Sequence, residues 1–198
     1  MIRILLTLLF LALPAQAQDF PALYAVTGVA ADDVLNIRSR PDAGAPIIGA
    51  LAPDSTGVEV LGRSGNWALV SAGEGMGYAS LRFLSREPGP SWAALEAPLT
   101  CIGTEPFWTL EIDPAAESTR FRTPEAPDPA AKPITGLWPA QPWARSAAVG
   151  LADGLAVLTG AECSDGMSDR SYGIAVDIFR TLSGREIRLA GCCSLGRP

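Results

Sequence analysis

The chemistry open to this chain is limited first by what it lacks, because its 198 residues include no histidine. Ser-His-Asp triads, Cys-His pairs and histidine-ligated zinc sites are excluded, together with the usual general base near neutral pH. Lysine occurs once, as Lys132, in a proline-rich stretch with no glycine-rich segment before it. Schiff-base and P-loop phosphate chemistry would rest on that residue alone. We therefore expect no catalytic residue, no metal and no cofactor.

Carboxylates remain as acid–base groups, and three of them fall in one stretch, Glu162-Cys163-Ser164-Asp165-Gly166-Met167-Ser168-Asp169-Arg170. Oxygen ligands suit calcium, but the spacing differs from the D-x-D-x-D-G pattern of calcium loops. We predict instead a turn in which Asp165 and Asp169 cap backbone groups. A glycoside hydrolase needs only two carboxyl groups, so this activity stays open as an alternative. Its candidate groups would be Glu105, Glu162, Asp165 and Asp169.

Four cysteines form an even set, and all of them follow residue 100: Cys101, Cys163, Cys192 and Cys193. Their spacings lack the paired C-x-x-C knuckles of a four-cysteine zinc site and the C-x-x-C of a thiol oxidoreductase. If the adjacent Cys192 and Cys193 lie on a strand, their side chains point to opposite faces and cannot easily bond each other. We predict two long disulfides that join this pair to Cys101 and Cys163, with the choice of partner left open.

The first 17 residues have the composition of an export signal. Met1-Ile2-Arg3 supplies a positive start, residues 4–13 are apolar except for Thr7, and Ala15-Gln16-Ala17 is a small-x-small cleavage site. A helix of ten residues spans about 15 Å, half of a bilayer's hydrocarbon core, so we expect cleavage rather than stable membrane insertion. Residues 1–17 are predicted to be a signal peptide, and the mature protein to be periplasmic or secreted, where disulfides persist.

The formal net charge is −6, and the loss of Arg3 with the signal peptide would make it −7. A negative protein is repelled by phosphate backbones and by anionic lipid surfaces. We therefore expect no nucleic-acid partner.

Residues 24–86 alternate short apolar runs with turn residues and leave little room for a helix. Turn signals at Arg40-Pro41-Asp42, Ala52-Pro53-Asp54 and Ser64-Gly65-Asn66 separate the runs. Five short strands in so few residues favour a small barrel, with Trp67 as a large part of its core. The strands are expected at residues 34–38, 47–51, 58–61, 67–70 and 77–79, and residues 18–23 are expected to be a tail.

The order of motifs in this segment resembles a bacterial SH3-type (SH3b) domain. The resemblance rests on Leu35-Asn36-Ile37-Arg38-Ser39-Arg40-Pro41, Ser64-Gly65-Asn66-Trp67 and Gly77-Tyr78-Ala79. It implies a barrel of five to six strands in an exported protein. Some members bind cell-wall peptides and others act as targeting or interaction modules, so the resemblance implies peptidoglycan or an envelope protein as the partner.

Cationic and aromatic side chains of this segment could form one binding face for a peptide that carries a carboxylate. Other roles stay open, because Trp67 could be a core residue and Asn36 and Arg38 could satisfy backbone groups of a loop. The candidate ligand-binding residues here are Asn36, Arg38, Arg40, Trp67 and Tyr78.

A second β domain is expected at residues 99–195, after a linker at residues 87–98 that contains proline and glycine. Alternation from Thr109 to Asp113 predicts a half-buried strand whose inner face carries Trp108, Leu110 and Ile112. Further strands are expected at residues 147–151, 155–159, 172–179 and 186–190, with hairpin turns at Asp153-Gly154 and Ser183-Gly184.

Six prolines between Thr123 and Pro142 argue against a helix or a central strand and predict an extended loop. Within it, the stretch Trp138-Pro139-Ala140-Gln141-Pro142-Trp143 either forms a docking surface for a partner or packs onto the domain. We expect packing.

Three motifs of the second domain resemble a family of small exported or lipoprotein-like envelope proteins without an established activity. They are Gly103-Thr104-Glu105-Pro106-Phe107-Trp108, the stretch from Cys163 to Asp169, and Gly191-Cys192-Cys193. A second ligand surface is expected near the Cys163–Tyr172 loop, with Glu105, Asp165, Asp169 and Arg170 as candidate ligand-binding residues.

The sequence thus predicts an all-β protein, with a small SH3-like barrel at residues 24–86 followed by a disulfide-linked β domain, either a barrel or a sandwich. The predicted function is that of a non-catalytic, exported cell-envelope binding protein. The alternative is a cell-wall hydrolase that uses paired carboxylates in the second domain.

Overall fold

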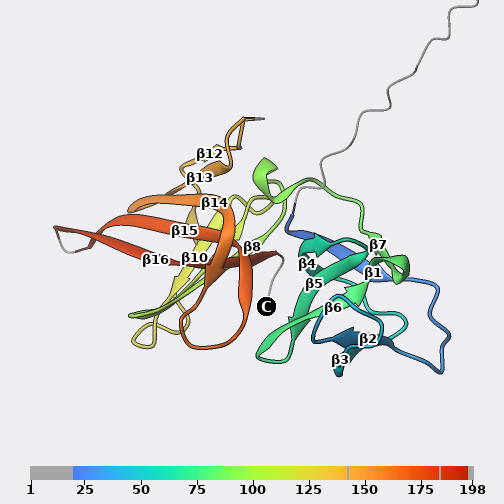
Figure 1. The fold of residues 1–198 in the computed structure, drawn as a ribbon. Helices are drawn as coiled ribbons and strands as arrows, with labels where there is room; N and C mark the ends of the chain where they lie inside the picture. Colours follow the sequence, from blue (N-terminus) through green and yellow to red (C-terminus); the bar gives the residue numbers. More distant parts are fainter. Residues whose placement is uncertain (1–19, 142, 183, 196–198) are drawn as a thin grey trace, which may run out of the picture.

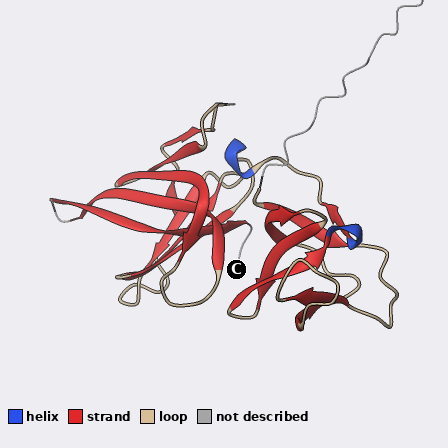
Figure 2. Ribbon diagram, in the orientation of Figure 1, coloured by secondary structure: helices blue, strands red, loops and turns tan. Residues whose placement is uncertain are grey.

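The computed structural model describes residues 20–141, 143–182 and 184–195, whose strands form two antiparallel sheets (Figures 1 and 2). Helical structure in these residues is limited to two short 3₁₀ helices, η1 (Leu81–Phe83) and η2 (Trp92–Ala94). The prediction of an all-β fold is confirmed. The predicted signal peptide, residues 1–17, and Ser183 of the predicted hairpin turn lie outside the described residues. Within those residues, we find no helix with the length and apolar character needed to cross a membrane.

The first sheet contains seven strands in the order β3-β2-β6-β5-β4-β1-β7. Its strands alternate between a core-facing and an outer side, as expected for half-buried strands. Val60, Val70 and Ala79 are fully buried in its core. The strands are β1 (Ala22–Val26), β2 (Leu35–Arg38), β3 (Ile47–Leu51), β4 (Val58–Ser64), β5 (Trp67–Ala72), β6 (Gly75–Ser80) and β7 (Leu84–Arg86).

The start of β1 corrects the prediction of a tail at residues 18–23. Ala22, Tyr24 and Val26 all point into the core of the first sheet, and β1 pairs with both β4 and β7. The strand escaped prediction because its first core position is a small alanine that directly follows Pro21, which carries little of the alternating signal of a strand.

The second sheet contains nine strands in the order β11-β10-β9-β8-β16-β15-β14-β13-β12. Most neighbours are consecutive in the chain, and β16 returns to pair with β8. The strands are β8 (Leu99–Thr104), β9 (Phe107–Asp113), β10 (Ser118–Arg122), β11 (Lys132–Pro133), β12 (Gly136–Trp138), β13 (Ser146–Leu151), β14 (Gly154–Ser164), β15 (Ser171–Leu182) and β16 (Arg185–Leu195).

Residues 132–138 join the two ends of the second sheet. β11 pairs with β10, β12 pairs with β13, and the two residues between them donate their amides to Glu117 and Gly150. The sheet therefore closes into an up-and-down barrel. This corrects part of the predicted loop at residues 123–142, where two very short strands tolerate proline because they make few ladder hydrogen bonds.

The interior of this barrel is packed with side chains. Trp108, Leu110 and Ile112 are buried, as predicted from the alternation along β9. Trp92 and Leu95, from the segment expected to be a linker, belong to the same core. A Cβ at Gly160 would lie 2.9 Å from the Trp92 ring, so glycine at this position leaves room for η2 to pack onto the barrel.

Two disulfides, Cys101–Cys193 and Cys163–Cys192, tie the second sheet. The prediction that the adjacent cysteines point to opposite faces is confirmed. Cys193 bonds Cys101 within the barrel core. Cys192 points to the other face of β16, where it bonds Cys163 near the end of β14. The predicted pair of long bridges is therefore present, and its partners are now assigned.

The unit built on the first sheet, which we call the first barrel, packs against the barrel formed by the second sheet. The Leu195 amide in β16 donates a hydrogen bond to the Glu59 carboxyl in β4 over 3.3 Å. Asp169 lies beside Gly75, and Pro21 lies against Gly173. The loop that carries Asp169 therefore contacts the first sheet, although Met167 in the same loop is 68% exposed.

Candidate functional site

The most developed hollow on the first barrel lies between β2, the segment that precedes it and η1. We call it the β2–η1 groove. Its volume of about 580 Å³ falls within the range typical of small-molecule and peptide side-chain pockets. It is lined by Gly28, Val29, Ala30, Asp33, Val34, Leu35, Asn36, Arg38, Ala43, Trp67, Ser80, Arg82 and Phe83.

Three of the predicted ligand-binding residues meet in this groove: Asn36, Arg38 and Trp67. The expectation that Trp67 is a core residue is wrong. Ala68 and Val70 fill the core positions of β5, so the strand alternation directs Trp67 to the opposite side. Trp67 is half-buried and forms part of the groove wall.

Two guanidinium groups give the groove a positive character. Arg38 donates from Nη1 to the carbonyl of Ala45 over 2.7 Å, which anchors its side chain beside the loop between β2 and β3. Arg82 is exposed and lies over the Phe83 ring, 5.4 Å from its centroid. Guanidinium groups next to aromatic surface can pair with a carboxylate while the rings cover apolar atoms.

The groove also contains residues that sequence reasoning did not select. Asp33, Arg82 and Phe83 lie outside the strand core motifs, and η1 brings the latter two to the groove by turning the chain after β6. A 3₁₀ turn of three residues leaves no hydrophobic period in the sequence, so only the Leu81-Arg82-Phe83 composition could have drawn attention to it.

Two predicted residues lie apart from the groove lining. Tyr78 in β6 is the register partner of Arg38, and its side chain is half-buried. Arg40 is exposed in the turn that follows β2, where its carbonyl accepts a hydrogen bond from the Asp42 amide. The structure therefore separates the predicted set into three groove residues and two neighbours.

In the second barrel, Asp165 organises the loop between β14 and β15. Its Oδ1 accepts hydrogen bonds from the amides of Met167 and Ser168, both over 2.9 Å, and its Oδ2 accepts one from the Ser168 hydroxyl. These bonds hold the pKa of Asp165 below its ordinary value of 3.8. The Thr104 hydroxyl donates to the Asp165 carbonyl, linking two of the motifs. The predicted capping role is confirmed for Asp165.

The other predicted residues of the second barrel are dispersed. Glu105 is exposed in the turn between β8 and β9, and Asp169 faces the first barrel. Arg170 lies over the Tyr172 ring, 5.6 Å from its centroid. None of these residues or Asp165 lines the β2–η1 groove. Within the described part of the chain, no three acidic or cysteine side chains gather as a metal site would require.

The tryptophans of the proline-rich stretch do not pack as expected. Trp138 is 55% exposed and Trp143 is 83% exposed. The Trp138 ring lies across Gly136 of its own strand, where a Cβ would come within 2.5 Å of it. These two tryptophan rings therefore cover little of the barrel.

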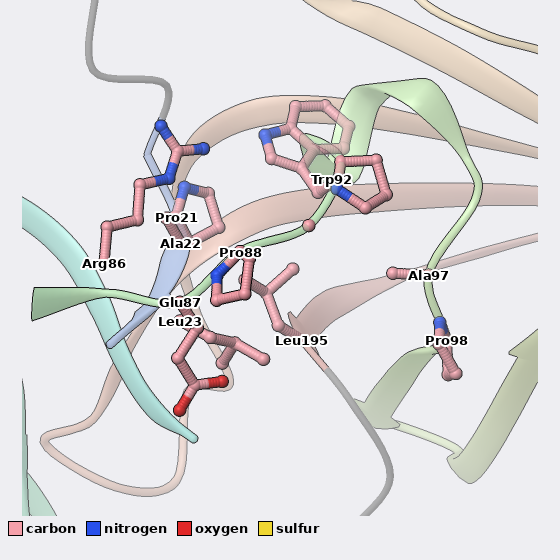
Figure 3. Close-up of a pocket in the computed structure, with 12 residues that line it drawn as sticks. Pro21, Ala22, Leu23, Arg86, Glu87, Pro88, Trp92, Ala97, Pro98 and Leu195 are labelled. Carbon is pink, nitrogen blue, oxygen red and sulfur yellow. The ribbon is translucent and has the colours of Figure 1, made fainter. Parts of the chain in front are cut away.

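A smaller apolar pocket of about 190 Å³ lies at the junction of the two barrels (Figure 3). Prolines 21, 88, 90 and 98 contribute to its wall, together with Leu23, Trp92 and Leu195. The Glu87 carboxylate at its rim accepts a hydrogen bond from the Gly57 amide over 2.6 Å. Because it is small and its acidic group is already engaged, this junction pocket is a weaker candidate than the β2–η1 groove.

Comparison with known families identifies the first barrel. Residues 33–85 match the family model of the bacterial SH3 domain, so this part of the chain is a bacterial SH3 domain. The match includes most of the groove lining. No match to the chain was found among curated proteins or solved structures. The family resemblance of the second barrel stays a prediction.

Proposed function

We propose that this protein is a non-catalytic binding protein of the bacterial cell envelope, and that its SH3 domain binds a peptidoglycan peptide through the β2–η1 groove. The observation that carries the proposal is the meeting of Asn36, Arg38 and Trp67 in a groove of ligand size on that domain. Bacterial SH3 domains suggest a cell-wall or peptidoglycan-binding module. An envelope protein is the other class of partner that the domain admits.

The groove chemistry supports a ligand with a free carboxylate. Peptidoglycan stem peptides carry carboxylates next to short apolar side chains. Arg82 could pair with the carboxylate, and Trp67 and Phe83 offer apolar surface for the neighbouring atoms. Asn36 can both donate and accept hydrogen bonds to the peptide backbone.

The cellular location follows the same reasoning. Two disulfides and a bacterial SH3 domain fit a location outside the cytoplasm, since disulfides persist in oxidising compartments. We infer that residues 1–17 direct export and are removed, which leaves the protein in the periplasm or secreted.

The cell-wall hydrolase remains the competing hypothesis. A paired-carboxylate mechanism needs one carboxylic acid that keeps its proton until it donates it. Asp165 is poorly suited to this role, because hydrogen bonds to both of its oxygens stabilise the ionised form. This observation favours binding over catalysis in the Cys163–Tyr172 loop.

Retention on purified cell-wall sacculi tests the proposal. We expect the wild-type protein to be retained, and Arg82→Gln to lose roughly tenfold in affinity because one carboxylate partner is removed. Arg185→Gln changes another exposed arginine, in the β15–β16 hairpin of the second barrel; it is the matched control and should bind like the wild type.

Two results would count against the proposal. Equal retention of Arg82→Gln and the control would place the contact elsewhere, and no retention of the wild type would favour a protein partner. Release of soluble muropeptides from the same sacculi would instead support the hydrolase.

A further inference from the structure

One carboxyl group, that of Glu59, accepts a hydrogen bond across the contact between the two barrels. It projects from β4 of the SH3 domain, and its Oε1 accepts the hydrogen bond from the Leu195 amide of the second barrel. Glu59 lines neither the β2–η1 groove nor the junction pocket. Glu59 is half-buried, so its carboxyl group is partly shielded from solvent at the contact between the units.

We propose that Glu59 is a pH-sensitive latch, which holds the SH3 domain against the disulfide-linked barrel at acidic pH and loosens this contact as the pH rises. The latch does not depend on which ligand the SH3 domain binds. It determines how firmly the two barrels are docked.

The surroundings of Glu59 explain why its protonation would matter. From the loop between β14 and β15, Arg170 lies within electrostatic reach and Asp165 and Asp169 lie on the same loop. Tyr172 in β15 interacts electrostatically with Glu59 and with Arg170. On the SH3 side, the register partner of Glu59 in β1 is Leu23, and β7 leads to Arg86 and Glu87 at the junction pocket.

Compensation for a charge on Glu59 is incomplete. Arg170 is the cation that favours the ionised form of Glu59, but it also interacts electrostatically with Asp165 and Tyr172. Among the ion pairs of the described residues, none joins Arg170 to Glu59 within 4 Å. The Arg170 Nε is buried and, among the described residues, has no hydrogen-bond partner. A carboxylate that is shielded from solvent without a close counter-ion is costly, and the neutral acid costs less in the same place.

Desolvation is the main reason that the pKa of Glu59 rises from 4.5 to about 7, and the Leu195 hydrogen bond and the Arg170 charge oppose this rise. The docked state therefore binds a proton that a solvated glutamate releases near 4.5. Docking is favoured fully below that value and is weakened as the pH rises through about 7. The linkage relation gives a fall in the docking constant on the order of 10²-fold between pH 5 and pH 8.

Hydrogen exchange in the full, disulfide-intact chain tests the latch. The probe is the protection of the Leu195 amide, measured from pH 5 to pH 8 and corrected for the intrinsic exchange rate. In the wild type, protection should fall on the order of 10²-fold across this range. In Glu59→Gln, which is neutral at every pH and keeps an oxygen acceptor, protection should change little with pH.

Glu74→Gln is the matched control, because Glu74 is exposed in the β5–β6 turn of the same domain. It should show the pH dependence of the wild type. Constant protection in the wild type, or equal pH dependence in Glu59→Gln, would overturn the proposal. If Glu59→Gln fails to fold, carbon NMR of the wild-type Glu59 carboxyl decides: a midpoint near 7 supports the latch and one near 4.5 overturns it.

Discussion

Two tryptophans, one in each barrel, show how differently these two β units use the same residue type. Trp67 in the SH3 domain lies on the outer side of β5 and forms part of a groove wall. Trp108 in the second barrel is 4% exposed and stacks on Phe121, with ring centroids 5.6 Å apart. Gly103 makes this burial possible, because a Cβ there would lie 2.1 Å from the Trp108 ring.

The position of a tryptophan in the strand alternation, rather than its hydrophobicity, therefore decides whether it lies in the core or on the surface. The two units also differ in what stabilises them. The SH3 domain relies on a small apolar core, whereas the second barrel combines a filled interior with two disulfides. The following variants test whether this division holds.

The largest effect is expected from removing the disulfide inside the barrel. Cys101→Ala with Cys193→Ala should lower the free energy of unfolding of the second barrel by about 4.5 kcal/mol, since the bridge closes a loop with a sequence separation of 92 residues. Calorimetry should show a shifted barrel transition. The pair Cys163→Ala and Cys192→Ala, with a separation of 29, should cost about 3.5 kcal/mol. An equal loss of stability in the SH3 domain would show that the two units are not stabilised separately.

Truncation of the two tryptophans tests whether one is a core residue and the other a groove residue. Trp108→Ala should destabilise the barrel by about 3–5 kcal/mol, because it leaves a large cavity in a packed interior. Trp67→Ala should cost about 1 kcal/mol or less and reduce retention on sacculi instead. Denaturant unfolding and binding of both variants provide the measurement, and similar destabilisation of the two would contradict the assigned roles.

A smaller effect is expected at the β13–β14 turn, where the buried Arg180 pairs with Asp153 over 2.5 Å and lies 3.9 Å from the Phe121 ring centroid. Asp153→Asn should cost about 2 kcal/mol, because it leaves the Arg180 guanidinium buried without its counter-ion. Asp177→Asn, which removes the partner of exposed Arg188, is the control and should cost far less.

The same ion pair predicts a pH dependence. Desolvation acts to raise the pKa of Asp153, but the hydrogen bond and charge of Arg180, helped by Lys132, lower it below 3.8 overall. Its contribution to stability is therefore present above pH 3.8 and is lost as the pH falls through the lower, folded-state pKa. Acid titration of unfolding in wild type and Asp153→Asn should converge at the acidic end; parallel curves would contradict this account.

The smallest effect is expected from Asp165→Ala, which removes the acceptor for two amides and one hydroxyl. The loop between β14 and β15 should lose about 1 kcal/mol of local stability, because these bonds are partly replaced by water. Faster hydrogen exchange of the Met167 and Ser168 amides would report this loss. Unchanged exchange would show that the disulfide at Cys163 orders the loop without the cap.

Much of the fold could be predicted from local patterns. Alternation placed Trp108, Leu110 and Ile112 on one face, and the adjacency of Cys192 and Cys193 argued against a bond between them. The closure of the barrel by residues 132–138 could not be predicted, because β11 and β12 are only two and three residues long and leave no alternating pattern in the sequence. The packing of Trp92 was hidden because its neighbour Gly160 lies far along the chain.

The candidate site was predicted only in part. Asn36, Arg38 and Trp67 were found because they belong to strand motifs, whereas Arg82 and Phe83 reach the groove through a 3₁₀ turn without a sequence period. The role of Glu59 could not be predicted, because its environment is created by the second barrel. Contacts between the two units cannot be predicted from the sequence pattern of either segment alone.

The central claim is that the SH3 domain binds a carboxylate-bearing peptidoglycan peptide in the β2–η1 groove. Amide chemical-shift mapping of the full chain during titration with soluble stem peptides tests it most directly. The account predicts that saturable shifts concentrate at groove residues such as Asn36, Trp67 and Arg82. Two results would contradict it: chemical-shift changes confined to the second barrel, or no chemical-shift changes although the protein is retained on sacculi.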